Sequence, residues 1–159
     1  MSFTSREFRD ALGAFATGVC VITAHSNGGE PFGLTVNSFA SVSLDPPLIL
    51  WSLQNDSEMY EAFEQSSRFG VNILRTQHQD LSNQYAKKDD HALSADHFEI
   101  GASGVPIMPA TMVSMECEVE ARHAAGDHII LVGRVVEFTQ REPGEPLLFC
   151  AGSYRALAS

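Results

Sequence analysis

The chain has 159 residues, a formal net charge of −10 and a hydrophobic content of 44%. This length fits one globular domain, and we expect residues 1–159 to form a single domain. The acidic balance disfavours nucleic acids and anionic membranes as partners, because both select basic surfaces. The N-terminus lacks the apolar core of a signal peptide, and no apolar run approaches the roughly 18 residues of a membrane span. We therefore expect a cytoplasmic protein.

The three cysteines favour the same compartment. Cys20, Cys117 and Cys150 are far apart in the sequence, odd in number, and form no CxxC pair. Each lies in an apolar run, so we expect buried thiols rather than ligands or disulfides. Buried free thiols suit a reducing cytoplasm.

Helix signals are few in this sequence. Thr4 and Glu7 form a capping-box pattern, which predicts a helix over residues 5–16 that Gly18 ends. Asp56 and Ser57 are suited to cap a helix that runs to about Gln65. A third helical pattern covers residues 77–86.

Strand signals are more numerous. Short apolar runs predict buried strands, and the turn at residues 26–29 predicts a hairpin between the first two; these strands cover residues 19–24, 31–37, 48–53 and 69–74. Strict alternation from Val113 to Ala121 predicts a strand whose wet face carries Ser114 and the glutamates, and residues 128–138 predict its partner. Residues 87–109 read as a long polar excursion. Many strands without a regular βαβ alternation indicate a mainly β barrel with helices.

A polar segment over residues 33–43 is the first candidate site. Its donor side chains are Thr35, Asn37, Ser38, Ser41 and Ser43. Together with backbone N–H groups, these donors can surround a polar-edged heterocycle and a phosphate. A turn-rich loop with self-capped side chains is the alternative, and composition alone favours it.

Three further features carry possible chemistry. Residues 51–57 place polar groups at a strand end before the predicted helix start, which suits a phosphate as well as an ordinary N-cap. His128 opens a strand after Gly126 and Asp127; it is suited to a nicotinamide, a flavin edge or a phosphate, or it is a solvated hairpin residue. Asp127 and His128 are adjacent, so we expect their side chains to diverge, which argues against a hydrolytic triad. Tyr154 and Arg155 offer a ring and a cation near the C-terminus.

A metal site is not expected. His91, Asp96 and His97 are the candidate ligands, but their spacing fits neither HExxH nor a Cys/His site. Lys87 and Lys88 next to them indicate a solvated loop.

Taken together, the order and spacing of these segments resemble the short-chain flavin reductase family, the reductase components of two-component flavin monooxygenases. The matching segments span nearly the whole chain; they are residues 15–23, 33–39, 41–43, 45–48, 69–74, 125–128 and 152–155. The resemblance implies the FMN-binding split barrel, a Greek-key-like six-stranded β-barrel with helices.

The resemblance also implies roles for individual residues. Catalytic roles fall to His128 and Tyr154, on the face where the nicotinamide approaches. Flavin contacts are implied for two segments and these two residues, namely Thr35, Val36, Asn37, Ser38, Ala40, Ser41, Ser52, Leu53, Gln54, Asn55, Ser57, His128 and Tyr154. Ala40 and Ser41 would lie near the ribityl chain and phosphate, and no metal is implied.

The implied function is an NAD(P)H:flavin oxidoreductase that transfers a hydride from NADH or NADPH to FMN or FAD. Such an enzyme supplies reduced flavin to a partner monooxygenase, and the family is typically homodimeric. The cofactor carries this chemistry, so no acid–base dyad is required of the protein. The alternatives are a flavin-carrying electron-transfer protein and a reductase of another acceptor such as a corrin.

Overall fold

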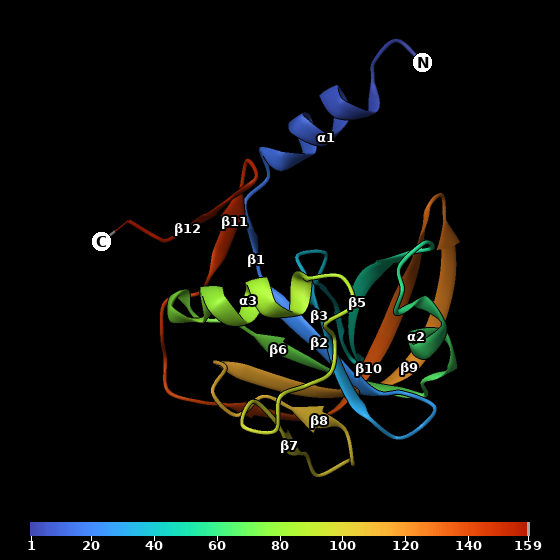
Figure 1. Cartoon of the computed structure of the whole chain (residues 1–159), viewed down its shortest axis with the longest axis vertical. Helices are drawn as coiled ribbons and strands as arrows, with labels where there is room; N and C mark the ends of the chain where they lie inside the picture. Colours follow the sequence, from blue (N-terminus) through green and yellow to red (C-terminus); the bar gives the residue numbers. More distant parts are fainter. Residues whose placement is uncertain (159) are drawn as a thin grey trace.

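The protein is mainly β with few helices (Figure 1). The computed structural model describes residues 1–158. Its helices are α1 (Ser5–Gly13), α2 (Tyr60–Gln65), the 3-10 turn η1 (Thr76–His78) and α3 (Gln79–Ala86). Its strands are β1 (Thr17–Gly18), β2 (Cys20–His25), β3 (Pro31–Val36), β4 (Ala40–Leu44), β5 (Pro47–Gln54), β6 (Arg68–Ile73), β7 (Glu99–Ile100), β8 (Pro106–Ile107), β9 (Val113–Ala125), β10 (His128–Gln140), β11 (Leu148–Cys150) and β12 (Ser153–Arg155).

A curved antiparallel sheet with the order β3-β2-β6-β9-β10-β5-β4 forms the body of the molecule. It has seven strands, one more than the six expected, because Ala40–Leu44 pairs with β5 as an edge strand. The predicted hairpin is present: β2 and β3 pair from Cys20 and Val36 to His25 and Pro31. β3 and β4 form the two edges of the sheet, so the polar segment that joins them passes from one edge to the other.

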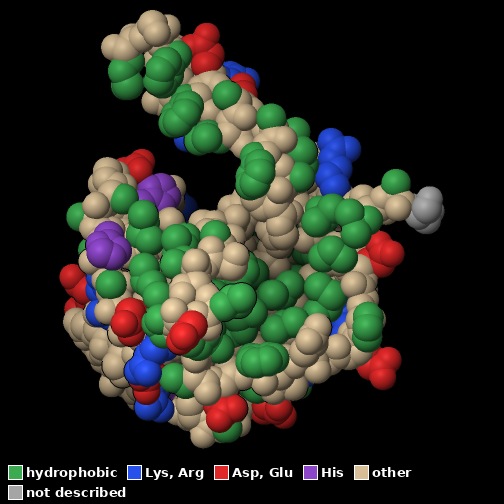
Figure 2. All heavy atoms as spheres, turned by 180° about the vertical axis from the view of Figure 1, so that it is seen from behind, with side chains coloured by type: hydrophobic (Ala, Val, Ile, Leu, Met, Phe, Trp, Pro, Cys, Tyr) green, Lys and Arg blue, Asp and Glu red, His purple; other side chains and the backbone are tan. Residues whose placement is uncertain are grey.

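The N-terminal helix α1 projects from this body (Figures 1 and 2). It starts with the predicted capping box of Thr4 and Glu7. It ends at Gly13, three residues before the predicted end, and Gly18 lies in β1 instead. None of the nine described residues of α1 is buried, and Phe15 just beyond it is 79% exposed. The apolar stripe of α1 is therefore without a partner within the described chain.

A small second sheet joins α1 to the body. It has the order β1-β11-β12, with Thr17 opposite Phe149 and Phe149 opposite Tyr154. The Ala151 N–H donates to the carbonyl of Gly13 at 2.7 Å, which fixes the end of α1 against the C-terminal hairpin. β12 is an edge strand of this small sheet, not of the large one.

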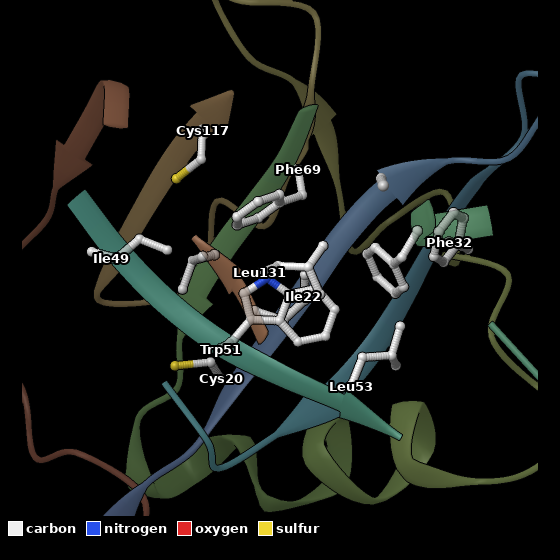
Figure 3. Close-up of a cluster of buried hydrophobic side chains, with 12 residues drawn as sticks. Cys20, Ile22, Phe32, Ile49, Trp51, Leu53, Phe69, Cys117 and Leu131 are labelled. Carbon is white, nitrogen blue, oxygen red and sulfur yellow. The ribbon is translucent and has the colours of Figure 1, made fainter. Parts of the chain in front are cut away.

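The main core lies inside the curved sheet and is built around Trp51 (Figure 3). Trp51 is fully buried on β5, and its ring packs edge-on against Phe63 at 4.8 Å and Phe69 at 5.9 Å between centroids. Cys20 and Cys117 are buried in the same core, as predicted, whereas Cys150 is only half-buried. Because Ser52 follows Trp51, the core holds the part of β5 that leads to the candidate site.

The prediction of a wet face on β9 is wrong at two positions. Ser114 is 1% exposed and Glu116 is 3% exposed. The excursion after α3 folds over this face, where the Ser103 N–H donates to Glu116, and the Ser114 hydroxyl donates to Asn72 of the neighbouring strand β6. A buried carboxylate that accepts a backbone N–H is tolerated, whereas a buried carboxylate without a partner is not.

Within residues 1–158, no helix is long and apolar enough to cross a membrane.

Candidate functional site

The end of β3 is anchored to α3 by Thr35. The Thr35 hydroxyl donates to the backbone carbonyl of Ser82 at 2.7 Å. Gly33 lets the chain after α3 pack closely on β3, because a Cβ there would lie 3.0 Å from Leu93 and 3.5 Å from Tyr85 of α3. Val36 and Asn37 then lead the chain out of the strand, with Asn37 exposed.

Ser38 connects the segment after β3 to β5. Its hydroxyl accepts from the Ser52 N–H at 2.9 Å and donates to the Ser52 carbonyl at 3.2 Å. Ala40 lies opposite Leu50 in the β4–β5 ladder, so Ser38 occupies the register position opposite Ser52. The side chain therefore satisfies the backbone groups that a longer β4 would have satisfied. This pair joins the two predicted flavin segments.

The end of β5 is attached to the turn before β10. The Asn55 N–H donates to the Asp127 carbonyl at 2.9 Å, and its side-chain amide donates to the Gly126 carbonyl at 3.2 Å. Gln54 lies opposite His128 in the ladder. His128 is thus brought to the 52–55 segment.

Asp127 and His128 do not diverge, contrary to the prediction. Nδ1 of His128 lies 2.6 Å from Oδ1 of Asp127. The alternation of side chains applies to residues within a strand, but Asp127 belongs to the turn and β10 begins only at His128. The hydrogen bond with His128 holds the pKa of Asp127 below its usual range. The Asp127 carboxylate orients the His128 imidazole. The segment that holds this pair has no serine nucleophile elbow, so the pair does not form a hydrolytic triad there.

Tyr154 is brought to the other end of the site. Its hydroxyl lies 2.6 Å from the Ser82 hydroxyl and donates to Oδ1 of Asn83 at 3.0 Å. A cavity of about 210 Å³ lies between β3, α3 and the small sheet. Its lining consists of Val19, Thr35, Val36, Asn37, Ser82, Ala86, Phe149 and Tyr154.

A second cavity, of about 310 Å³, adjoins the first at Ala86. Its lining is more polar and consists of Leu34, Gln54, Asp56, Ser57, Glu58, Ala86, Lys87, Lys88 and His91. Lys87 and Lys88 are its cations. Together the two cavities reach the range of about 300–1,000 Å³ that is typical of small-molecule sites.

A contact between His91 and Glu58 forms one wall of this second cavity. Nε2 of His91 lies 2.5 Å from Oε1 of Glu58, and its Nδ1 lies 3.0 Å from the Gly33 carbonyl. A hydrogen bond from the Asp89 N–H, and then the contact with His91, hold the pKa of Glu58 below its usual range. The buried His91 ring thus ties the lysine loop to β3 through these two contacts.

Several predicted residues lie elsewhere. Ala40 and Ser41 are exposed on β4, outside the two cavities. The side chain of Leu53 is 3% exposed and belongs to the main core, so only its backbone faces the site segment. Ser57, in contrast, lines the second cavity, as a predicted site residue should.

The predicted helix start at Asp56 and Ser57 is wrong. α2 begins at Tyr60, and Ser57 instead accepts from the Met59 N–H at 3.2 Å within a turn. The hydroxyl competes with the helix for a nearby backbone donor, as serine commonly does. The helix N-terminus that was predicted at Ser57 is therefore absent, because the six-residue α2 begins only at Tyr60.

Sequence reasoning missed Ser82, Glu58 and the two lysines. The sequence analysis places Lys87 and Lys88 in a solvated loop. Two adjacent cations on a chain of charge −10 are the signal by which these residues could have been found. Ser82 and Glu58 carry no pattern of their own, because their partners are distant in sequence.

Two of the candidate metal ligands, His91 and His97, contact other side chains of the protein. His91 contacts Glu58, and Nδ1 of His97 lies 2.7 Å from the Tyr85 hydroxyl. Within residues 1–158, no group of three His, Cys, Asp or Glu side chains is arranged to hold a metal ion.

The comparison with known proteins identifies the family. The family model described as "Flavin reductase like domain" matches residues 12–158. The chain belongs to the flavin reductase-like domain family. This confirms the resemblance and the mainly β split-barrel fold that it implied.

Two curated members of the flavin reductase-like family illustrate the match. The chain is 45% identical over 150 residues to FMN reductase (NADH) SmoA of Agrobacterium fabrum, covering 94% of this chain and 84% of that protein. It is 40% identical over 134 residues to the reductase component of flavin-dependent trigonelline monooxygenase from Acinetobacter baylyi. That match covers 84% of this chain and only 43% of the longer relative.

A solved structure of the family agrees in fold. The styrene monooxygenase flavin reductase of Pseudomonas putida S12 superposes with a TM-score of 0.86 at 37% identity. The match covers 96% of this chain and 98% of that one. The flavin reductase-like fold is therefore present over nearly the whole chain.

Proposed function

We propose that this protein is an NADH-dependent flavin reductase that reduces FMN and supplies it to a partner monooxygenase. The observation that carries the proposal is the pair of adjoining cavities, with hydrogen bonds that join the segments lining them to the segments next to them. Tyr154 bonds to Ser82, Ser82 to Thr35, Ser38 to Ser52, and the end of β5 to the turn before His128. Membership of the flavin reductase-like family supports the same function.

The residues around the cavities fit a flavin. The first cavity combines the apolar side chains of Val36 and Phe149 with polar groups at Thr35 and Asn37, which suits a ring with a polar edge. The second cavity is lined by Ser57, Lys87 and Lys88 as well as by the carboxylates of Asp56 and Glu58, and its hydroxyl and two cations suit a phosphate. Thr35 to Ser38 would hold the ring, and the two lysines would neutralise the phosphate.

A bound flavin supplies a ring that accepts a hydride from the nicotinamide, so the chain is required to bind and orient rather than to move protons. Tyr154 would offer its ring as a surface against the nicotinamide, with Phe149 packed edge-on behind it at 5.5 Å. His128, oriented by Asp127 through Nδ1, would present its Nε2 to a polar group of the nucleotide. Alignment of two rings at reacting distance is the main contribution expected of the protein.

The preference for FMN and NADH rests on the curated relative SmoA, an FMN reductase (NADH). The preference for a monooxygenase partner rests on relatives that are reductase components of such enzymes. The three free thiols suit work in the cytoplasm. Residues 1–159 would act as one flavin reductase-like domain.

The protein would act as a homodimer. Phe8 and Leu12 of α1 are 52% and 58% exposed, on a helix that projects from the body (Figure 2). The body exposes further large apolar side chains, with Leu44 at 97% and Phe138 at 62%. Apolar surface of this kind marks an interface, and a second copy offers a matching one by symmetry. We expect a dimer in analytical ultracentrifugation, and a monomer when Phe8 and Leu12 are both changed to Ser.

Stopped-flow absorbance tests the activity. NADH should bleach flavin absorbance near about 450 nm within seconds when the protein, FMN and NADH are mixed without oxygen, at a turnover of about 1–10³ s⁻¹. Parallel runs with FAD and with NADPH test the two preferences. An electron-transfer carrier would bind FMN, but neither nucleotide would reduce the bound FMN. That outcome would refute the proposed reductase function.

A further inference from the structure

We propose that Ser82 is a positioning residue that fixes the ring of Tyr154, and through it the approach of the nicotinamide to the flavin. The inference rests on the proposed reductase function. It adds to that function a residue of α3 that is set back from the reacting rings.

The burial and bonding of Ser82 are unusual for a helical serine. Ser82 lies in the middle of α3 and is 0% exposed. A serine inside a helix usually turns to solvent or bonds to a carbonyl of its own helix. Here its hydroxyl lies 2.6 Å from the Tyr154 hydroxyl, across 72 residues of sequence.

The direction of these bonds follows from the single phenol hydrogen. Tyr154 donates to Oδ1 of Asn83 at 3.0 Å, so the hydrogen between Tyr154 and Ser82 comes from Ser82. The Tyr154 hydroxyl therefore has both a donor and an acceptor partner on adjacent residues of α3. Two directed bonds restrict both the position and the rotation of the ring.

The same residue also holds the opposite wall of the cavity. The carbonyl of Ser82 accepts from the Thr35 hydroxyl at 2.7 Å. Thr35, Ser82 and Tyr154 all line the cavity of about 210 Å³. One buried residue thus sets the spacing between the β3 wall and the tyrosine ring.

The strand that carries Tyr154 needs such support. β12 has three residues and lies at the edge of the small sheet, where it pairs with β11 alone. The ring is packed edge-on against Phe149 of the same hairpin. The bond to Ser82 connects this hairpin to a helix that packs on the large sheet. Without it, the bond to Asn83 is the remaining side-chain hydrogen bond from the Tyr154 hydroxyl to α3.

Steady-state and stopped-flow kinetics of Ser82→Ala, Tyr154→Phe and the double variant test the proposal. Both single changes remove the Ser82–Tyr154 bond and keep the aromatic ring, and Tyr154→Phe also removes the bond to Asn83. We expect each to lower the rate constant of flavin reduction at saturating NADH, or raise the KM for NADH, by about tenfold, below the roughly hundredfold that a misplacement of about 1 Å costs. The Kd for FMN should change less than threefold. The double variant should be no worse than Tyr154→Phe alone.

Ser114→Ala is the matched control. Ser114 is also a buried serine, and its hydroxyl donates to Asn72 at 3.0 Å, outside both cavities. Its loss should lower the unfolding midpoint and leave the kinetics unchanged. Hydrogen exchange gives an independent readout: residues 148–155 should exchange faster in Ser82→Ala than in the wild type or Ser114→Ala.

The outcomes separate the two proposals. If wild-type protein fails to reduce flavin with either nucleotide, the reductase function is wrong, and hydrogen exchange alone then decides whether Ser82 positions the hairpin. If the wild type is active but Ser82→Ala keeps its nicotinamide kinetics, or the double variant loses activity additively, the role of Ser82 is refuted. If Ser82→Ala does not fold, Tyr154→Phe tests the same bond.

Discussion

Ser38→Ala tests how one hydroxyl substitutes for a missing strand residue. The Ser52 N–H and carbonyl point away from β10 and beyond the end of β4, and the Ser38 hydroxyl satisfies both. A neutral hydrogen bond contributes about 0.5–1.5 kcal/mol net. Two such bonds predict that the free energy of unfolding falls by about 1–3 kcal/mol in Ser38→Ala.

Trp51 provides the assay, because it is the single tryptophan and is buried next to Ser52. Urea unfolding followed by its fluorescence gives the free energy, and quenching on addition of FMN gives the Kd. Loss of the link between the two site segments should raise the Kd about tenfold, which corresponds to about 1.4 kcal/mol.

Ser41→Ala is the matched control for stability. Ser41 is an exposed residue of β4, and a surface change of this kind should alter stability by less than about 0.5 kcal/mol. The reasoning about Ser38 would be refuted by an unfolding free energy and an FMN Kd that both match those of Ser41→Ala.

Three further predictions address the nucleotide, the phosphate and the thiols. His128→Ala should raise the KM for NADH more than the Kd for FMN in the same assays, and an equal loss of both would show that His128 is misplaced. Ser41→Asp should leave the Kd for FMN unchanged in a fluorescence titration, because Ser41 lies outside the cavity that Lys87 and Lys88 line; weaker binding by charge repulsion would instead place the phosphate near β4, as the family resemblance implies. Burial raises the pKa of Cys20 and of Cys117 to about 12, so both thiols stay protonated at pH 8; a disulfide reagent should titrate Cys150 alone in native protein, and three thiols in denaturant.

The strands were largely predictable because their signal is local. The apolar runs that predict β2, β5 and β6 match the observed strands within one or two residues, and the Ser26–Gly29 turn correctly predicted the β2–β3 hairpin. β-branched and aromatic residues pack well on a pleated, buried surface whichever strands become neighbours. The family resemblance then supplied the split-barrel architecture, which periodicity does not contain.

The errors in the secondary structure share one cause. Glu116 and Ser114 are buried because a distant loop covers them, and Ser57 bonds to Met59 instead of starting a helix. In each case a polar side chain found a partner that its own periodicity does not indicate. Alternation shows which residues share a face of a strand, but not what later covers that face.

A mainly β, flavin reductase-like chain with polar segments at residues 33–43 and 51–57 can be predicted from the sequence. How these segments meet is seen only in the folded chain, through Ser38 with Ser52, Asn55 with Asp127, and Ser82 with Tyr154. The difference lies in the reach of the forces involved. Hydrophobic patterning is written into neighbouring residues, whereas a hydroxyl's partner depends on which distant backbone or side-chain group the fold brings within about 3 Å.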